Sequence, residues 1–289
     1  RMNWFEGISL CPGGAVGPIH VLPALTNQKG VSLPTVEEEL ERLEAARETA
    51  LARLEEQRAA AREQLGEEEA EIFRLHALML EDQDFVETAQ KAVRAGRCAE
   101  DGVREAEETF AAAFRALDDP YLQGRMADVE EVSRLWREVL AGGAGRLELE
   151  RPAILWAKEC SSGELIALDR DKALGLVVEH MAPDSHAAIL VRAMGLPTVT
   201  GIAPQKHWEG VYAALDAERG RLWLEPEESV RAALEQKCRQ AQARRRELER
   251  WRAAPVRTWD GRTVTVCANI GSAREAALGV RDEDGVLAR

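Results

Sequence analysis

A change of hydrophobic period along the chain is the feature that most limits its fold. Residues 35–143 carry apolar side chains at helical spacing, and Thr35 with Glu38 forms a capping-box pattern at the start of this block. On either side, in residues 7–22 and 153–224, short strand-like runs appear. Because an unpaired strand leaves backbone hydrogen-bonding groups unsatisfied, we expect the early strands to join the later ones. The helical block is therefore predicted to be an insertion in an α/β unit.

The predicted fold class is α/β with an inserted all-α helical subdomain of four or five helices. Residues 1–34 and 146–226 are expected to form the α/β subdomain, and residues 35–145 the helical insertion. Residues 227–253 are helical in pattern but heavily charged, which predicts a linker helix. Residues 254–289 begin with a hairpin signal and are assigned to the start of a further domain.

Composition narrows the function classes. The chain has 289 residues and a formal net charge of −13, which argues against a nucleic-acid partner and suits a basic one. No apolar run approaches the ~20 residues of a membrane span and no secretory signal is visible, so we expect a cytoplasmic protein without membrane insertion. The five cysteines are scattered and lack CxxC spacing, which favours free thiols, and no metal site is predicted.

The segment around His186 is the strongest candidate for chemistry. An apolar run, residues 174–178, predicts a buried strand, and a helix is expected to begin near Ser185. The first turn of a helix presents unpaired N–H groups and the positive end of its dipole, which together favour an anion. A neutral imidazole is nucleophilic, so His186 is well placed to carry a phosphoryl group. The alternative is that Ser185 only caps the helix and His186 is a surface residue.

These residues resemble the phosphohistidine segment of Enzyme I of the sugar phosphotransferase system. That segment usually reads Gly-Gly-x-x-Ser-His-x-x-Ile-x-Ala-Arg and continues to x-Pro-x-Val-x-Gly. The chain keeps Ser185, His186, Ile189, Arg192, Pro197, Val199 and Gly201. It has Met181 and Ala182 where the pattern has glycines, which would let the backbone approach a phosphate closely. The short motif also occurs in pyruvate phosphate dikinase and its relatives.

The resemblance to Enzyme I extends over residues 7–289 in the same order, and it includes the helical insertion, which the dikinases lack. Further matching stretches are Gly7-Ile8, Pro12-Gly13, Gly66-Glu67-Glu68, Phe73, His76, Leu80-Glu81-Asp82, Leu117-Asp118-Asp119, Tyr121-Leu122, Arg125, Ala127-Asp128-Val129 and Asn269-Ile270-Gly271. The Enzyme I-like module of the dihydroxyacetone kinase phosphoryl donor is similar in the same way. The resemblance implies a swivelling phosphohistidine α/β domain, a helical subdomain, a linker helix and, from residue 254, the start of a barrel domain that continues past Arg289.

The activity implied by the resemblance is phosphoryl transfer from phosphoenolpyruvate, through a phosphohistidine at His186, to the carrier protein HPr. Phosphoenolpyruvate and Mg²⁺ would bind to the barrel domain, and no cofactor is expected in this fragment. Ser185 is assigned to the catalytic site with His186. Ser161 stands where the family has a Thr whose hydroxyl lies near the histidine, so it could fix the imidazole tautomer. Ser161 could equally cap the helix that follows it.

The helical region is the part of the family that binds HPr. Between Val36 and Asp82 the chain has 15 acidic residues and 6 arginines, a face that would steer a basic partner toward the site. The residues assigned to partner binding are Glu67, Glu68, His76, Met79, Glu81, Asp82 and Arg125. Two alternatives remain at this point: the acidic residues form only a solvated face, and the apolar ones belong to the core of the helical bundle.

A different class of function also fits the sequence. In this alternative the chain is a catalytically degenerate docking module that binds a phosphocarrier or a sister domain without turnover. Met181 and Ala182, in place of the two glycines, are the residues that motivate it. The sugar or polyol pathway, the efficiency of transfer, the oligomeric state and the composition of the full-length polypeptide do not follow from the sequence.

Overall fold

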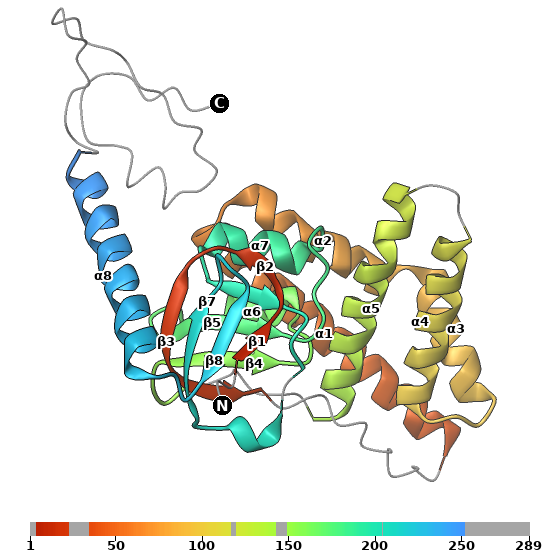
Figure 1. Cartoon of the computed structure of the whole chain (residues 1–289). Helices are drawn as coiled ribbons and strands as arrows, with labels where there is room; N and C mark the ends of the chain where they lie inside the picture. Colours follow the sequence, from red (N-terminus) through yellow and green to blue (C-terminus); the bar gives the residue numbers. More distant parts are fainter. Residues whose placement is uncertain (1–3, 23–34, 117–119, 143–148, 204, 252–289) are drawn as a thin grey trace, which may run out of the picture.

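The computed structural model describes residues 4–22, 35–116, 120–142, 149–203 and 205–251. A group of helices lies on one side of a curled sheet, and a long C-terminal helix leaves the opposite side (Figure 1). Residues 254–289, which the sequence assigns to a further domain, lie outside the described residues. No helix in the described part of the chain is both long and apolar enough to cross a membrane.

The helical insertion predicted from the sequence is present and contains five helices among the described residues. These are α1 Val36–Gln64, α2 Glu67–Glu81, α3 Gln83–Arg94, α4 Ala99–Arg115 and α5 Pro120–Leu140. Thr35 caps α1 by accepting a hydrogen bond from the Glu38 amide at 3.2 Å, as the capping-box pattern predicts. The indole of Trp136, fully buried, donates to the Leu43 carbonyl at 3.0 Å and so ties α5 to α1.

The eight described strands form one sheet drawn from both sides of the helical insertion. They are β1 Trp4–Glu6, β2 Ile8–Cys11, β3 Gly14–Val21, β4 Ala153–Ala157, β5 Ala173–Val178, β6 Thr198–Thr200, β7 Tyr212–Asp216 and β8 Arg221–Leu224. Their order is β1-β8-β7-β3-β4-β5-β6-β2. Strand β3 pairs in parallel with β4, Ile19 lying opposite Ile154, and antiparallel with β7. The expectation that the N-terminal strands join the later ones is confirmed.

The sheet curls until its two ends meet at one residue, a feature that the sequence did not predict. Strands β1 and β2 stand at opposite ends of the strand order, yet only Gly7 separates them in the chain. The Gly7 amide donates to the Gly220 carbonyl at 2.8 Å. A Cβ atom on Gly7 would lie 2.4 Å from the Thr200 carbonyl oxygen, so only glycine fits this corner.

The curled sheet has an apolar core on each face. In the core on the inner face of the sheet, the ring centroid of Trp156 lies 4.2 Å from that of Trp208 and 6.4 Å from that of Phe5. On the other face, helices α6 (Ser162–Ala167) and α7 (His186–Met194) pack in a core that continues into the helical insertion. This shared core fixes the position of α7 relative to the insertion.

Helix α8, Glu228–Trp251, follows the last strand and packs against β3 and β7. Leu234 is its buried anchor, and the Lys237 ammonium lies 3.2 Å from the buried Asp216 carboxylate. The short 3₁₀ helix η1, Lys206–Trp208, places Trp208 in the inner core. Helix α8 confirms the helix predicted between residues 227 and 253.

Candidate functional site

His186 occupies the position that the sequence predicts, the first residue of a helix after a buried strand. Strand β5 ends at Val178, and α7 begins at His186 with Ser185 as its N-cap. The Ser185 hydroxyl accepts a hydrogen bond from the Ala188 amide at 3.2 Å and donates to the Ala182 carbonyl at 2.8 Å. The His186 side chain is 41% exposed, so one edge of its ring is open to a reactant.

The buried edge of the His186 ring faces a carboxylate from the helical insertion. Its Nδ1 lies 3.0 Å from Oδ1 of Asp128, which belongs to α5. The hydrogen bond with Asp128 raises the pKa of His186 against the opposing effect of burial. Burial alone would raise the pKa of Asp128, but hydrogen bonds from His186 and His76 outweigh it and hold that pKa well below its usual value.

The contact selects which ring nitrogen of His186 can react. When the imidazole is neutral, an Nδ1–H that donates to Asp128 leaves the lone pair on Nε2. Nε2 is the ring nitrogen remote from the backbone. The arrangement therefore suits a nucleophilic imidazole at the dipole-positive end of α7.

The Asp128 carboxylate also contacts two other side chains. Nε2 of His76, on α2, lies 3.5 Å from the same oxygen that His186 contacts. The guanidinium of Arg125 donates to the other carboxylate oxygen at 3.0 Å. His76 is only 3% exposed, so a partner protein cannot contact its side chain, and the prediction that it binds a partner directly needs correction. The packing of α2 against α5 buries the His76 side chain.

Ser161 acts as a helix cap. Its hydroxyl accepts from the Glu164 amide at 3.2 Å, and its backbone amide donates to the Glu164 carboxylate at 2.7 Å, which completes a capping box for α6. Its neighbour Ser162 donates instead to Glu131 of α5 at 3.1 Å. The place beside Nδ1 of His186 that the resemblance assigned to Ser161 is thus occupied by Asp128.

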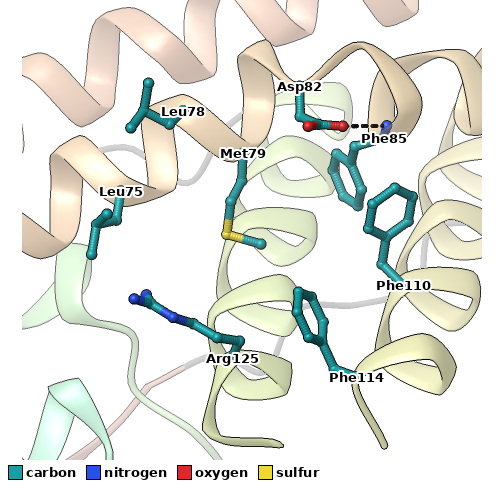
Figure 2. A pocket seen from close by; sticks show the side chains of 8 residues that line it. All are labelled: Leu75, Leu78, Met79, Asp82, Phe85, Phe110, Phe114 and Arg125. Atoms are coloured by element: carbon teal, nitrogen blue, oxygen red, sulfur yellow. Dashed lines mark hydrogen bonds between the residues drawn. The ribbon is translucent and has the colours of Figure 1, made fainter. Parts of the chain in front are cut away.

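A pocket of about 370 Å³ lies in the helical insertion, between α2, α3, α4 and α5 (Figure 2). Its walls are mostly apolar and are formed by Leu75, Leu78, Met79, Asp82, Phe85, Phe110, Phe114 and Arg125. Figure 2 shows Met79 and Arg125 facing one another across it. Three of the predicted partner-binding residues, Met79, Asp82 and Arg125, therefore meet at one concave surface.

The three glutamates predicted to bind a partner lie at the two ends of α2. Glu81 is exposed beside the pocket. Glu67 and Glu68 are exposed in the first turn, away from the pocket, and Glu67 is paired with Arg62 at 2.6 Å. The acidic face is thus real, but part of its charge is neutralised by arginines of α1.

The loop before His186 is built without the two glycines of the Enzyme I pattern. Met181 is buried in the core, and its amide donates to the Thr200 hydroxyl at 3.1 Å. Among the described residues other than glycine, only Glu225 has a positive φ, so neither Met181 nor Ala182 is strained. Arg192 braces the loop by donating to the Pro183 carbonyl at 3.0 Å.

Comparisons with known proteins agree with this architecture. The family model described as PEP-utilising enzyme, N-terminal, matches residues 6–125, and the one described as PEP-utilising enzyme, mobile domain, matches residues 149–220. The chain belongs to the family of PEP-utilising enzymes. Its curated relatives are longer, and the chain spans about a third to a half of their length.

Two curated relatives illustrate the degree of sequence similarity. The chain is 32% identical to the multiphosphoryl transfer protein of Xanthomonas campestris pv. campestris, over 94% of this chain and 33% of the relative. It is 30% identical to the phosphoenolpyruvate-protein phosphotransferase of Haemophilus influenzae, over 93% of this chain and 48% of the relative.

Solved structures of Enzyme I regions share the fold of this PEP-utilising family member. A solution structure of Enzyme I, 23% identical, has a TM-score of 0.64 and covers 82% of this chain and 99% of that one. The N-terminal domain of Enzyme 1 - Nitrogen, 29% identical, has a TM-score of 0.56 and covers 86% of this chain and 99% of that one. The fold class, an α/β subdomain with a helical subdomain, is thereby established.

Two acidic residues of the site were missed by sequence reasoning. Asp128 was noted only as part of a matching stretch, and Glu131 was not singled out. Their signal is a spacing of three between Arg125, Asp128 and Glu131, which places all three on one face of a helix. The sequence alone does not show that this face of α5 is turned toward the N-terminus of α7.

Proposed function

We propose that the chain is the phosphohistidine-bearing part of a phosphoenolpyruvate-dependent phosphotransferase and that His186 carries the phosphoryl group. The observation that supports this most directly is the 3.0 Å contact between Nδ1 of His186 and Asp128, at the N-terminus of α7. As the bond from Nε2 to phosphorus forms, the bond from phosphorus to the donor breaks and its electrons leave with the donor. The Nδ1 proton stays with the imidazole, where Asp128 stabilises the developing positive charge.

The acceptor is proposed to be a basic phosphocarrier of the HPr type, docked on the helical insertion. The pocket at Met79 and Phe114 offers apolar anchoring, and exposed Glu81 and Asp82 beside it offer negative charge. Arg125 lies between this pocket and Asp128, so the pocket and the reactive ring are near one another. A carrier seated there can present its acceptor group to His186.

The rest of the reaction is assigned to parts of the protein outside the described residues. Phosphoenolpyruvate and Mg²⁺ are proposed to bind to a barrel domain, in keeping with the longer relatives named phosphoenolpyruvate-protein phosphotransferase. With that domain, the protein would work in the cytoplasm as the first carrier of a sugar or polyol phosphotransferase system.

The second candidate function is a docking module without turnover. The observation that favours it is the loop at Met181, whose side chain fills the core where the Enzyme I pattern has a glycine. A loop anchored in this way has less freedom to wrap a phosphate than a glycine pair has. In this case the pocket would still bind a carrier, but His186 would not become phosphorylated.

Incubation with phosphorylated HPr distinguishes the two functions. We expect the intact chain to gain the mass of one phosphoryl group, in a linkage that acid removes. His186→Ala should abolish the gain. His180→Ala, which changes an exposed histidine on the same loop, should leave it intact. An unlabelled wild-type chain that still binds HPr would favour the docking module and refute phosphoryl transfer.

A further inference from the structure

Two histidines from different helices share one oxygen of Asp128. His186 approaches Oδ1 from α7 at 3.0 Å, and His76 approaches the same atom from α2 at 3.5 Å. Asp128 itself is buried, and its second oxygen accepts from Arg125. The carboxylate thus has polar groups on both sides, so rotation about its χ2 angle would break at least one contact.

The far side of His76 faces a second carboxylate. Its Nδ1 lies 3.9 Å from a carboxylate oxygen of Glu131, and that carboxylate accepts from the Ser162 hydroxyl at 3.1 Å. The polar chain therefore runs from α7 to α5, to α2, back to α5 and on to α6. The charged and titratable groups that face His76 are Asp128 and Glu131, and those that contact Asp128 are His76, His186 and Arg125.

We propose that His76 is a positioning residue for His186: its Nε2–H holds the Asp128 carboxylate in the orientation that keeps the His186 proton on Nδ1. This role rests on the function proposed above, because it prepares Nε2 of His186 to accept a phosphoryl group. Networks of this kind orient a reactive imidazole more firmly than a single contact does. His76 itself touches neither substrate nor carrier.

The position of His76 also links the docking pocket to the reactive ring. It lies on α2 directly after Leu75 and three residues before Met79, both of which line the pocket. Arg125, the other donor to Asp128, lines the same pocket. A carrier that presses on this surface therefore acts on two of the three groups that hold the carboxylate.

Two substitutions of nearly equal size test this role. In His76→Gln the side-chain amide can reach the place of Nε2 and still donate to Asp128. In His76→Asn the shorter amide reaches only the place of Nδ1, on the Glu131 side. We expect His76→Gln to behave nearly as wild type and His76→Asn to slow transfer from phosphorylated HPr by about 10- to 100-fold.

The decisive measurement is the nitrogen chemical shifts of the imidazoles by NMR, which report the tautomer of His186 directly. In the wild type and in His76→Gln we expect the neutral ring to carry its proton on Nδ1, and in His76→Asn a mixture of tautomers. A folded His76→Asn with an unchanged His186 tautomer and unchanged transfer would overturn the proposal.

The wild type provides a test that does not depend on how the variants fold. If His76 positions Asp128, its own proton must reside on Nε2, and that resonance should shift as His186 titrates. A proton found only on Nδ1 of His76 would overturn the proposal. The labelling experiment decides on the proposed function and the nitrogen shifts decide on the positioning, so failure of one is distinguishable from failure of the other.

Discussion

Asp128 and His186 lie on different subdomains, and the 3.0 Å contact between them joins the helical insertion to the α/β sheet. The contact pairs a buried carboxylate with a half-exposed imidazole. Any motion that carried α7 away from α5 would break it and leave Asp128 with His76 and Arg125 alone. The protonation of His186 and the association of the two subdomains are therefore coupled.

This coupling predicts how stability depends on pH. Because Asp128 raises the pKa of His186 above its ordinary value of 6.5, the pair stabilises the fold fully below that value, and the contribution is lost as pH rises through the folded pKa. Asp128→Asn should therefore lower the free energy of unfolding more near pH 6 than near pH 8. Urea unfolding at the two pH values checks this. Equal losses at both would contradict it, and His180→Gln, at an exposed histidine, serves as the control.

The docking pocket predicts a selective loss of carrier binding. Leu78 lines the pocket and is 47% exposed, so Leu78→Glu should leave the fold intact while placing a charge on the apolar wall. We expect binding to HPr, measured by calorimetry, to weaken by at least about tenfold, roughly 1.4 kcal/mol. The matched control is Ile8→Glu, at a 63% exposed apolar residue of β2. If both variants bound HPr equally well, the pocket would not be the docking site.

A partly buried arginine is predicted to stabilise the boundary between the subdomains. Arg134 of α5 is paired with Glu164 of α6, and it also donates to Glu138 at 3.2 Å. Removing the shared cation of this partly buried cluster leaves the carboxylates of Glu138 and Glu164 without it, so Arg134→Met should cost about 1–3 kcal/mol in urea unfolding. Arg74→Met breaks an exposed pair with Glu71 and should change stability little. Similar effects of the two substitutions would show that the Arg134 cluster does not stabilise the boundary.

The closed corner of the sheet predicts that Gly7 cannot be replaced. Gly7→Ala would bring a Cβ to 2.4 Å from the Thr200 carbonyl oxygen, which is backbone and cannot move aside. We expect a loss of about 1–3 kcal/mol or more in the free energy of unfolding. In Gly17→Ala the new Cβ meets only the end of the Leu174 side chain, at 2.7 Å, and a rotamer change can relieve it. Thermal melts of the two variants should separate clearly, and a Gly7→Ala variant as stable as Gly17→Ala would refute the steric argument.

Local patterns in the sequence were sufficient for most of the secondary structure. The N-cap at Thr35, the helix at Ser185 and the strand β5 depend on neighbouring residues, and they appear where the pattern predicts them. The participation of the N-terminal strands in the sheet also followed, because unpaired strands need neighbours. Strand β1 was not anticipated, since its pairing with β8 depends on the curvature of the whole sheet.

The candidate site could be predicted only in part from the sequence. His186 and its helix terminus are local features and were predicted. The role of Asp128, the burial of His76 and the capping by Ser161 depend on how α5 and α2 pack against α6 and α7, which no local pattern determines. The pocket likewise gathers side chains from four helices, although Met79, Asp82 and Arg125 had been selected.

The pairing of β1 with β8 also determines when the protein can finish folding during biosynthesis. Trp4 is synthesised about 200 residues before its partner Trp223. The helices made in between have mostly local contacts and can form before the partner strand of β1 has been synthesised. Until β8 has been made, β1 lacks its partner strand, so the growing chain exposes an unpaired strand edge that is prone to aggregation during this interval.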